Sequence, residues 1–467
     1  MTATPPAPST GARIHRDQDH GQRKATAEAP LVLDTAPPRP LGFRDQAAFW
    51  SNLGVSLLGF SGAIWVLAPS GHAQLSLLAA ITATVVGTLF GTAMLAVSGV
   101  LGTRTGAPAM AVLRGLFGTR LSYLPTVLNI VQCIGWGVFE LTVITMGVEA
   151  LTDGRGPHWL YIVLAGLLTT ALTVWPLGSM RLLRRYVTVA VGVAMLYFSV
   201  QLLRQDTPPL TEGSWGGFLP AVDSALAVAV SFVPMAADYT RHSRSTARSF
   251  LGTLVGYSTA QIWCYLLGLL ALLRVDGDSE RIFDTFLGVS AGWLFFAVLV
   301  VREVDQSFAN VYSTAMSVHN LLPRVDRRVL TVGIGALVTL LATQVDDFST
   351  YESFLYLLGS VFVPMFAVTA VDFFFGSGRH GWDMSQRAPV RWLMLLPWAL
   401  GFATYQLLNP TQLTGWADAW PRFWLRAQDL TGVHATVWTS ASLFSFLVAA
   451  LVTLALAPVA RRRAVAR

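Results

Sequence analysis

A run of polar and ionisable residues lies within one of the apolar segments of this sequence. Arg302, Glu303, Gln306 and Asn310 fall on one face of a helix, and Asp305 flanks that face. Ionisable groups in an apolar helix are costly and face a bundle interior or water. Arg302 and Glu303 could neutralise each other as a structural or gating pair. Asp305 is a candidate cation ligand, for Na+, or a proton carrier.

A second polar stripe lies earlier in the chain. Gln132, Trp136 and Glu140 are spaced i, i+4 and i+8, which places them on one face of a helix. An indole ring can stack on a flat heterocycle, while a carboxylate accepts hydrogen bonds from ring N–H or amino groups. The trio therefore predicts a site for a planar nitrogenous ring. The alternative for Trp136 is packing against lipid or another helix.

Two apolar segments, five segments apart, are interrupted by small residues and proline. The first contains Gly54, Gly59 and Gly62 around Ser56 and Ser61, and the second contains Gly216, Gly217, Pro220 and the run Ser231-Phe232-Val233-Pro234. Such breaks persist in a membrane only where they line a cavity or are buried in protein. Matching positions are typical of inverted-repeat transporters, although glycine and proline are also common in ordinary membrane helices. The breaks make Gly62, Ser231 and Phe232 candidate substrate-binding residues, with Phe232 as a second aromatic wall.

These residues need apolar helices to position them. Hydrophobic residues make up 53% of the 467-residue chain and charged residues only 12%, whereas soluble proteins carry about 25% charged residues. A helix needs about 20 apolar residues to cross a bilayer. We therefore expect an all-α integral membrane protein in the lipid bilayer. The twelve predicted spans are 49–69, 74–101, 121–150, 158–176, 184–203, 216–237, 249–273, 289–320, 328–344, 353–375, 389–409 and 433–458.

The loops between these spans predict the orientation of the chain. Arginines gather in alternate loops, as in 181–185 and 324–328, and the opposite loops are acidic or sparse, as at Asp346 and Asp347. The positive-inside rule then places both termini in the cytoplasm. We expect the protein to lie in the inner (plasma) membrane. Asp238 and Arg241 fall where a span reaches the cytoplasmic side, so we expect them to form a structural cap or gate.

The remaining features exclude several classes of function. Residues 1–40 are rich in proline, threonine, alanine and charge and are predicted to be disordered, and 461–467 form a second cytoplasmic tail. The net charge of +6 comes from loop arginines and does not indicate a nucleic-acid partner, and no obligate protein partner is evident. No catalytic or cofactor-binding motif is present, so we expect no enzyme and no cofactor.

Several of these motifs together resemble the purine–cytosine permeases, the nucleobase–cation symporter family. The likeness extends from about Arg44 through the tenth span. Its landmarks are Gly102-Thr103-Arg104-Thr105-Gly106, Arg114-Gly115-Leu116-Phe117-Gly118, Gly135-Trp136, Ala237-Asp238-Tyr239-Thr240-Arg241 and the run from Asp305 to Ser313. The resemblance implies a leucine-transporter-like fold in a transmembrane domain at 41–460. Two inverted five-helix repeats would occupy about 49–203 and 216–375, followed by extra helices at about 389–458.

The resemblance also implies roles for individual residues. Trp136 matches the family's stacking tryptophan, Glu140 falls where relatives often carry glutamine, and Asn310 matches a substrate-binding asparagine. Backbone carbonyls near Ser56 and Phe60, with Asp305, fall at the family's sodium position. Relatives usually present hydroxyl groups there, so the carboxylate of Asp305 leaves both Na+ and H+ open as the coupling ion.

The leading hypothesis is a cation-coupled importer of a nucleobase, such as cytosine or a purine, by alternating access. A related small nitrogenous solute of the hydroxymethylpyrimidine, allantoin or hydantoin type is the nearest alternative. A membrane-embedded enzyme or sensor, or a passive channel, is the alternative of a different class.

Overall fold

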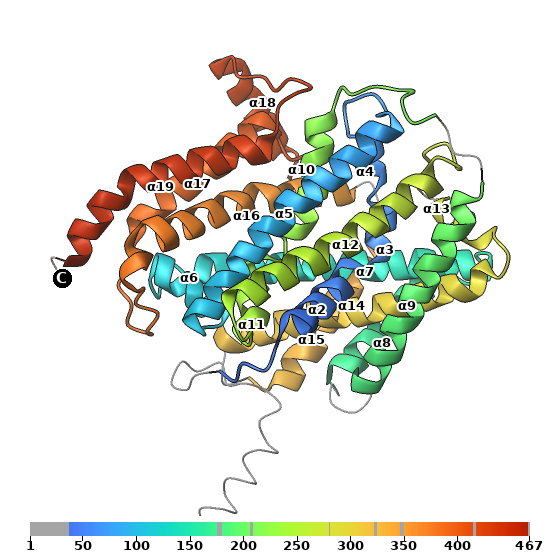
Figure 1. The fold of residues 1–467 in the computed structure, drawn as a ribbon, viewed down its shortest axis with the longest axis horizontal. Coiled ribbons are helices and arrows are strands. Elements are labelled where there is room, and N and C mark those ends of the chain that lie inside the picture. Colours follow the sequence, from blue (N-terminus) through green and yellow to red (C-terminus); the bar gives the residue numbers. More distant parts are fainter. Residues whose placement is uncertain are drawn as a thin grey trace, which may run out of the picture.

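Helices form nearly all regular structure in this protein. The computed structural model describes residues 37–174, 180–205, 209–279, 281–321, 325–345, 350–413 and 417–465. In those ranges every regular element is helical apart from two isolated β-bridges, which confirms the all-α prediction (Figure 1). Of the tail predicted to be disordered, 1–40, residues 1–36 lie outside the described residues, as does the acidic loop at Asp346 and Asp347. Residues 37–40 are described, and the Pro38 and Pro40 carbonyls accept hydrogen bonds from His242 and Arg244.

Each predicted span corresponds to a helix or to a broken helix. In chain order these are α2–α4 (Phe43–Gly54, Leu57–Ser61 and Ile64–Leu67), α5 (Leu77–Thr105), α7 (Tyr123–Thr152), α8 (His158–Val174), α9 (Met180–Leu203), α10–α11 (Phe218–Val230 and Ala236–Thr240), α12 (Thr246–Leu272), α14 (Gly292–Leu321), α15 (Arg327–Ala342), α16 (Thr350–Phe375), α17 (Leu395–Leu408) and α19 (Ala441–Val465). Three short helices were not predicted: α6 (Ala109–Phe117), α13 (Ile282–Leu287) and α18 (Ala419–Thr431).

Many of these helices are long and apolar enough to cross a membrane. Six described segments meet that criterion by length and composition, and the bent pair of α2 with α3–α4 adds a seventh. Three further helices are apolar but shorter. The charged residues inside α14 lower the hydropathy of that helix, which fits a position in the interior of the bundle rather than against lipid.

Both predicted interruptions are present. The chain bends by 60° between α2 and α3, where Val55 and Ser56 are not helical. The Ser56 hydroxyl accepts a hydrogen bond from the Leu58 N–H at 3.0 Å and so begins α3. The second interruption separates α10 from α11, where Pro234 stands in the one-turn 3₁₀ helix η1 (Val233–Met235).

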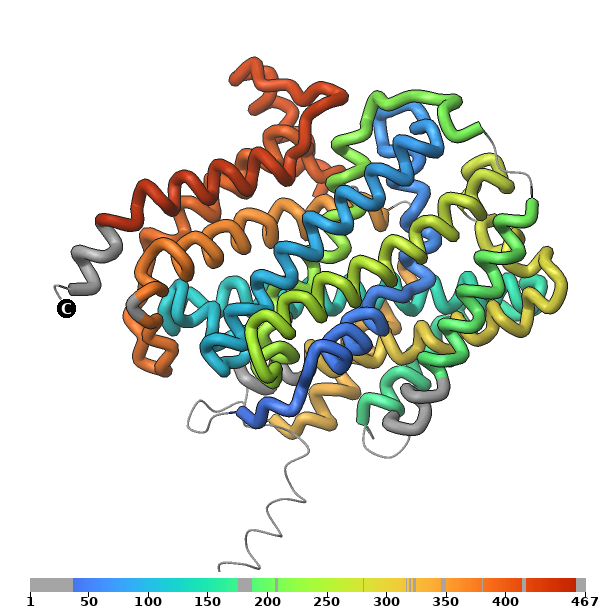
Figure 2. The backbone as a smooth tube through the Cα atoms, in the orientation of Figure 1, coloured from blue at the N-terminus to red at the C-terminus, as the bar shows by residue number. Residues whose placement is uncertain are grey.

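Small residues bring the first broken helix against α12. A side chain added at Gly256 would come within 2.3 Å of the Ala47 carbonyl oxygen, so only glycine allows this approach of α12 to α2. Figure 2 shows α12 running between α2 and α5, and α17 with α19 packs against α16 at one edge of the bundle. The first break is therefore held in the middle of the molecule by its neighbours.

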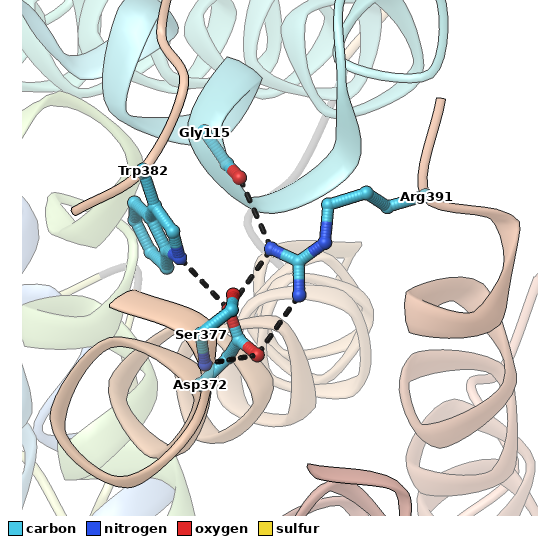
Figure 3. A network of polar contacts seen from close by, with 5 residues as sticks. All are labelled: Gly115, Asp372, Ser377, Trp382 and Arg391. Atoms are coloured by element: carbon cyan, nitrogen blue, oxygen red, sulfur yellow. Dashed lines mark hydrogen bonds and ion pairs between the residues drawn. The ribbon is translucent and has the colours of Figure 1, made fainter. Parts of the chain in front are cut away.

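A polar network joins the end of α16 to α6 and to the segment before α17 (Figure 3). The buried Asp372 carboxylate accepts two hydrogen bonds from Arg391, each of 2.9 Å, and one of 2.8 Å from the Trp382 indole N–H. Arg391 also donates to the Gly115 carbonyl at 3.1 Å. One guanidinium thus connects three chain segments.

Replacing Arg391 with lysine is expected to lower the free energy of unfolding by about 2 kcal/mol. Lysine presents a point charge and cannot bond to both Asp372 oxygens and to Gly115 in the same geometry. Thermal unfolding of the purified protein in detergent measures the change. Arg422→Lys is the control, because the Arg422–Asp418 pair is exposed and such pairs contribute little. Equal effects of the two changes would contradict the prediction.

Candidate substrate and cation site

A narrow cavity lies where both broken helices meet α7, α12, α14 and α16. It contains about 420 Å³ of empty space, a volume that includes space open to the outside. Its lining residues are Leu53, Gly54, Ser56, Leu58, Gly59, Trp136, Glu140, Val228, Phe232, Tyr257, Gln261, Tyr265, Gln306, Asn310 and Tyr351. The structure therefore brings five of the predicted site residues to one cavity: Ser56, Trp136, Glu140, Phe232 and Asn310.

Aromatic neighbours hold the Trp136 ring in place. The rings of Tyr351 and Phe354 meet it edge to face, with centroid distances of 5.9 and 5.3 Å. Gly135 makes room for this arrangement, because a side chain there would come within 2.5 Å of the Phe354 ring. Trp136 is only 8% exposed and lines the cavity, so its indole lies inside the bundle rather than against lipid.

The other two residues of the Trp136 stripe have different surroundings. Glu140 is 1% exposed and lines the cavity, and one of its carboxyl oxygens has no hydrogen-bond partner among the described residues. Gln132 instead donates to the Asn129 side chain at 2.8 Å and to the Ser231 carbonyl at 2.9 Å. Gln132 thus fastens α7 to the second break from outside the cavity lining, while Glu140 faces the cavity.

Phe232 stands at the second break and also faces the cavity. Trp50 and Tyr257 pack edge to face against its ring, at centroid distances of 6.3 and 5.5 Å. Ser231, the residue before it, turns its hydroxyl back to the Val228 carbonyl at 2.7 Å. Of the two predicted residues at this break, Phe232 therefore has the contact with the cavity and Ser231 has a local backbone role.

The carboxylate that contacts the first break, between α2 and α3, is that of Glu303. It accepts a hydrogen bond of 2.5 Å from the Ser56 hydroxyl and one of 2.9 Å from the Leu57 N–H. The sequence pointed to Asp305 beside Ser56, but Asp305 is only half-buried and Glu303 is 1% exposed. Glu303 also neighbours the carboxyl group of Glu140. The rotation of α14 therefore presents Glu303 to the break.

Arg302 does not bond to Glu303 in the described part of the chain, although the sequence suggested a neutralising pair. Its guanidinium donates to the Asn52 carbonyl in the last turn of α2 and to the Gln306 side chain at 2.9 Å. Gln306 in turn donates to the Leu53 carbonyl at 3.3 Å. Arg302 and Glu303 thus bind the two opposite sides of the same break.

The remaining predicted residues support the site from outside its lining. Gly62 ends α3, where its N–H donates to the Leu58 carbonyl at 2.7 Å, and Phe60 packs its ring against Phe286. Asp238 accepts a hydrogen bond of 2.8 Å from the Ala109 N–H at the start of α6. Arg241, at the end of α11, donates to the neighbouring His242 ring.

Comparison with known proteins identifies the family. A family model described as a permease for cytosine/purines, uracil, thiamine and allantoin matches residues 50–384. The chain belongs to this permease family. It is therefore a multi-pass membrane transporter rather than an enzyme, as the sequence predicted.

Individual relatives support the assignment at low sequence identity. The permease is 24% identical over 334 residues to the purine-cytosine permease homologue YxlA of Bacillus subtilis, covering 66% of this chain and 70% of YxlA. It is 23% identical over 341 residues to the purine-cytosine permease FCY21 of Saccharomyces cerevisiae, covering 65% of this chain and 64% of FCY21.

Solved structures show the fold. The permease superposes on the inward-facing conformation of Mhp1 with a TM-score of 0.73 at 17% identity, covering 94% of this chain and 95% of Mhp1. A closed conformation of Mhp1 with bromovinylhydantoin bound gives a TM-score of 0.68 at 17% identity, covering 93% and 96% of the two chains. MhsT in complex with L-phenylalanine gives 0.57 at 13% identity, covering 89% and 99%. These similarities confirm the leucine-transporter-like fold.

The permease lines its cavity with residues of α12 that sequence reasoning missed. Tyr257, Gln261 and Tyr265 are spaced i, i+4 and i+8, the same spacing as the Trp136 stripe, and this repeat is the signal that could have found them. Gln261 donates to the Ala225 carbonyl at 2.7 Å, which fixes its amide. In the part of the chain that is described, its carbonyl oxygen has no hydrogen-bond donor.

Proposed function

We propose that this permease is a secondary active importer of a planar nitrogenous ring, such as cytosine or a purine, driven by a cation gradient. The observation that supports this most directly is the pairing of Trp136 with Glu140 on the lining of one cavity. Alternating access would expose that cavity first to the outside and then to the cytoplasm of a plasma-membrane protein with both termini inside.

The side chains of the cavity suggest how such a ring binds. The Trp136 indole stacks on the ring face, and Phe232 bounds the cavity from the second break. Glu140 and the Gln261 carbonyl supply acceptors for ring N–H and amino groups. Asn310, half-buried on the lining, can donate or accept through its amide. This set favours rings with several donors.

Replacing Glu140 with glutamine is expected to reduce the preference for cytosine over uracil about tenfold, because an N–H₂ group replaces one acceptor oxygen. Uptake competition among cytosine, adenine, hydroxymethylpyrimidine and uracil measures the preference. Glu149→Gln is the matched control, since Glu149 is on the same helix but binds His158 away from the cavity. Unchanged selectivity of the Glu140 variant would overturn the assignment of Glu140.

The description of the family includes allantoin and thiamine, and the bound ligand of one Mhp1 structure is a hydantoin. Related small nitrogenous solutes are therefore the second candidate substrates. A thermal-stability screen of the purified permease against nucleobases, allantoin, hydantoins and hydroxymethylpyrimidine separates these groups. Accumulation of unchanged radiolabelled ligand in proteoliposomes tests import directly, and chemical conversion of the ligand or failure to accumulate it would overturn the proposal.

A further inference from the structure

The first break carries a permanent positive charge that belongs to the chain itself. The last carbonyl groups of a helix lack partners within that helix, and the partial negative charge at this end attracts cations. At the end of α2 the Asn52 carbonyl accepts from Arg302, and the Leu53 carbonyl accepts from Gln306. Arg302 and Gln306 also bond to each other. Donors of α14 thus occupy two carbonyls at the break.

The Ser56 hydroxyl at this break is hydrogen-bonded as well. Ser56 donates its only hydroxyl proton to Glu303, and its oxygen accepts from the Leu58 N–H. The Ser56 carbonyl accepts from the Gly59 N–H at 3.0 Å. A sodium ion bound through Ser56 would have to compete with these existing hydrogen bonds for its oxygen ligands.

The charge of Arg302 is buried and permanent. The side chain is 1% exposed, and a guanidinium keeps its proton in proteins. Two positive charges close together in a poorly solvated interior repel each other strongly. Arg302 also bonds to Gln306, which lines the cavity, so this one charge links the break to the cavity. A second cation at the α2 end of the break would lie beside this charge, while the Glu303 carboxylate contacts the start of α3.

We infer that Arg302 is an internal cation that takes the place of a transported Na+ at the first break, so that uptake by this permease does not require Na+. The independence of uptake from Na+ rests on the proposed function. The lack of Na+ binding at the break does not, and it can be tested without knowing the substrate. Because the proposed import is driven by a cation gradient, a proton gradient is then the driving force in place of a Na+ gradient.

Two measurements on the unmodified protein test this inference. In the first, purified permease is titrated with NaCl, KCl or choline chloride at equal ionic strength while thermal stability and tryptophan fluorescence are followed. We expect the three salts to give the same curves, and a saturable effect of Na+ alone would overturn the inference. In the second, initial uptake into proteoliposomes is compared in Na+ and choline media. We expect rates equal within about twofold, and a loss of about tenfold or more without Na+ would overturn it.

Variants of Arg302 test whether its charge is the cause. We expect Arg302→Gln to lower uptake at least about tenfold and Arg302→Lys to retain much more, because lysine keeps the charge. Arg274→Gln is the matched control, since Arg274 also donates to a backbone carbonyl, that of Leu202, but away from the cavity. Equal uptake by the glutamine and lysine variants would overturn the role of the charge.

The outcomes separate the two proposals. Uptake of a nucleobase that depends on Na+ would support the proposed function and overturn the inference. Equal response to the three salts without binding or uptake of any nitrogenous heterocycle would support the inference at the break and overturn the proposed function.

Discussion

Replacing Trp136 with alanine is expected to lower the affinity of the permease for its heterocyclic substrate about 100-fold. Alanine substitution of an aromatic that stacks on a base costs about 1–3 kcal/mol, and the upper part of that range corresponds to about 100-fold in affinity. The upper part applies here because Tyr351 and Phe354 hold the indole in place before a ligand binds. Equilibrium binding of radiolabelled ligand to purified protein measures the change.

Two further variants separate stacking from loss of structure. Trp136→Phe keeps an aromatic face and is expected to lose much less affinity than the alanine variant. Trp159→Ala removes a tryptophan that is 59% exposed on α8 and is expected to bind normally. If Trp136→Ala unfolds at the temperature of the unmodified protein and still binds with unchanged affinity, Trp136 does not stack on the substrate.

The positions of the two breaks could be predicted because their cause is local. Glycine, serine and proline disrupt a helix wherever it packs, so the interruptions at Ser56 and Pro234 followed from residue type alone. The stripe of Trp136 and Glu140 followed from helical spacing, which also depends only on the sequence. By contrast, the short helices α6 and α13 contain too few residues to give a periodic pattern.

The choice between Glu303 and Asp305 could not be made from the sequence. Two residues along a helix are about 200° apart around its axis, so only one of them can face the break. Glu303 lies on the polar face and Asp305 flanks it, and the rotation of α14 that decides between them is set by its packing against other helices, chiefly α7. Similarly, helical spacing placed Gln132 and Glu140 on one face of α7. It could not show at which level along α7 the cavity lies, and the cavity lies at the level of Glu140.

Removal of the Glu303 side chain is expected to abolish transport. Glu303→Ala leaves the Ser56 hydroxyl and the Leu57 N–H without their acceptor in the interior of the protein. Leaving a buried donor without its acceptor costs about 1–3 kcal/mol, and here two donors are affected. We expect the melting temperature to fall and uptake to decrease by about 100-fold or more. Thermal unfolding and proteoliposome uptake measure the two effects.

The conservative change Glu303→Gln tests whether transport needs the negative charge of Glu303 or only a side chain of the same size. Glutamine fills the same volume and its carbonyl can still accept from Ser56 or Leu57, so this variant is expected to fold while its uptake stays at least about tenfold below that of the unmodified protein. Asp305→Asn is the matched control, because it removes a carboxylate two residues further along α14 that is only half-buried. If Asp305→Asn loses transport while Glu303→Gln retains it, Asp305 rather than Glu303 is the carboxylate that transport requires. The contact of Glu303 with the break is then structural.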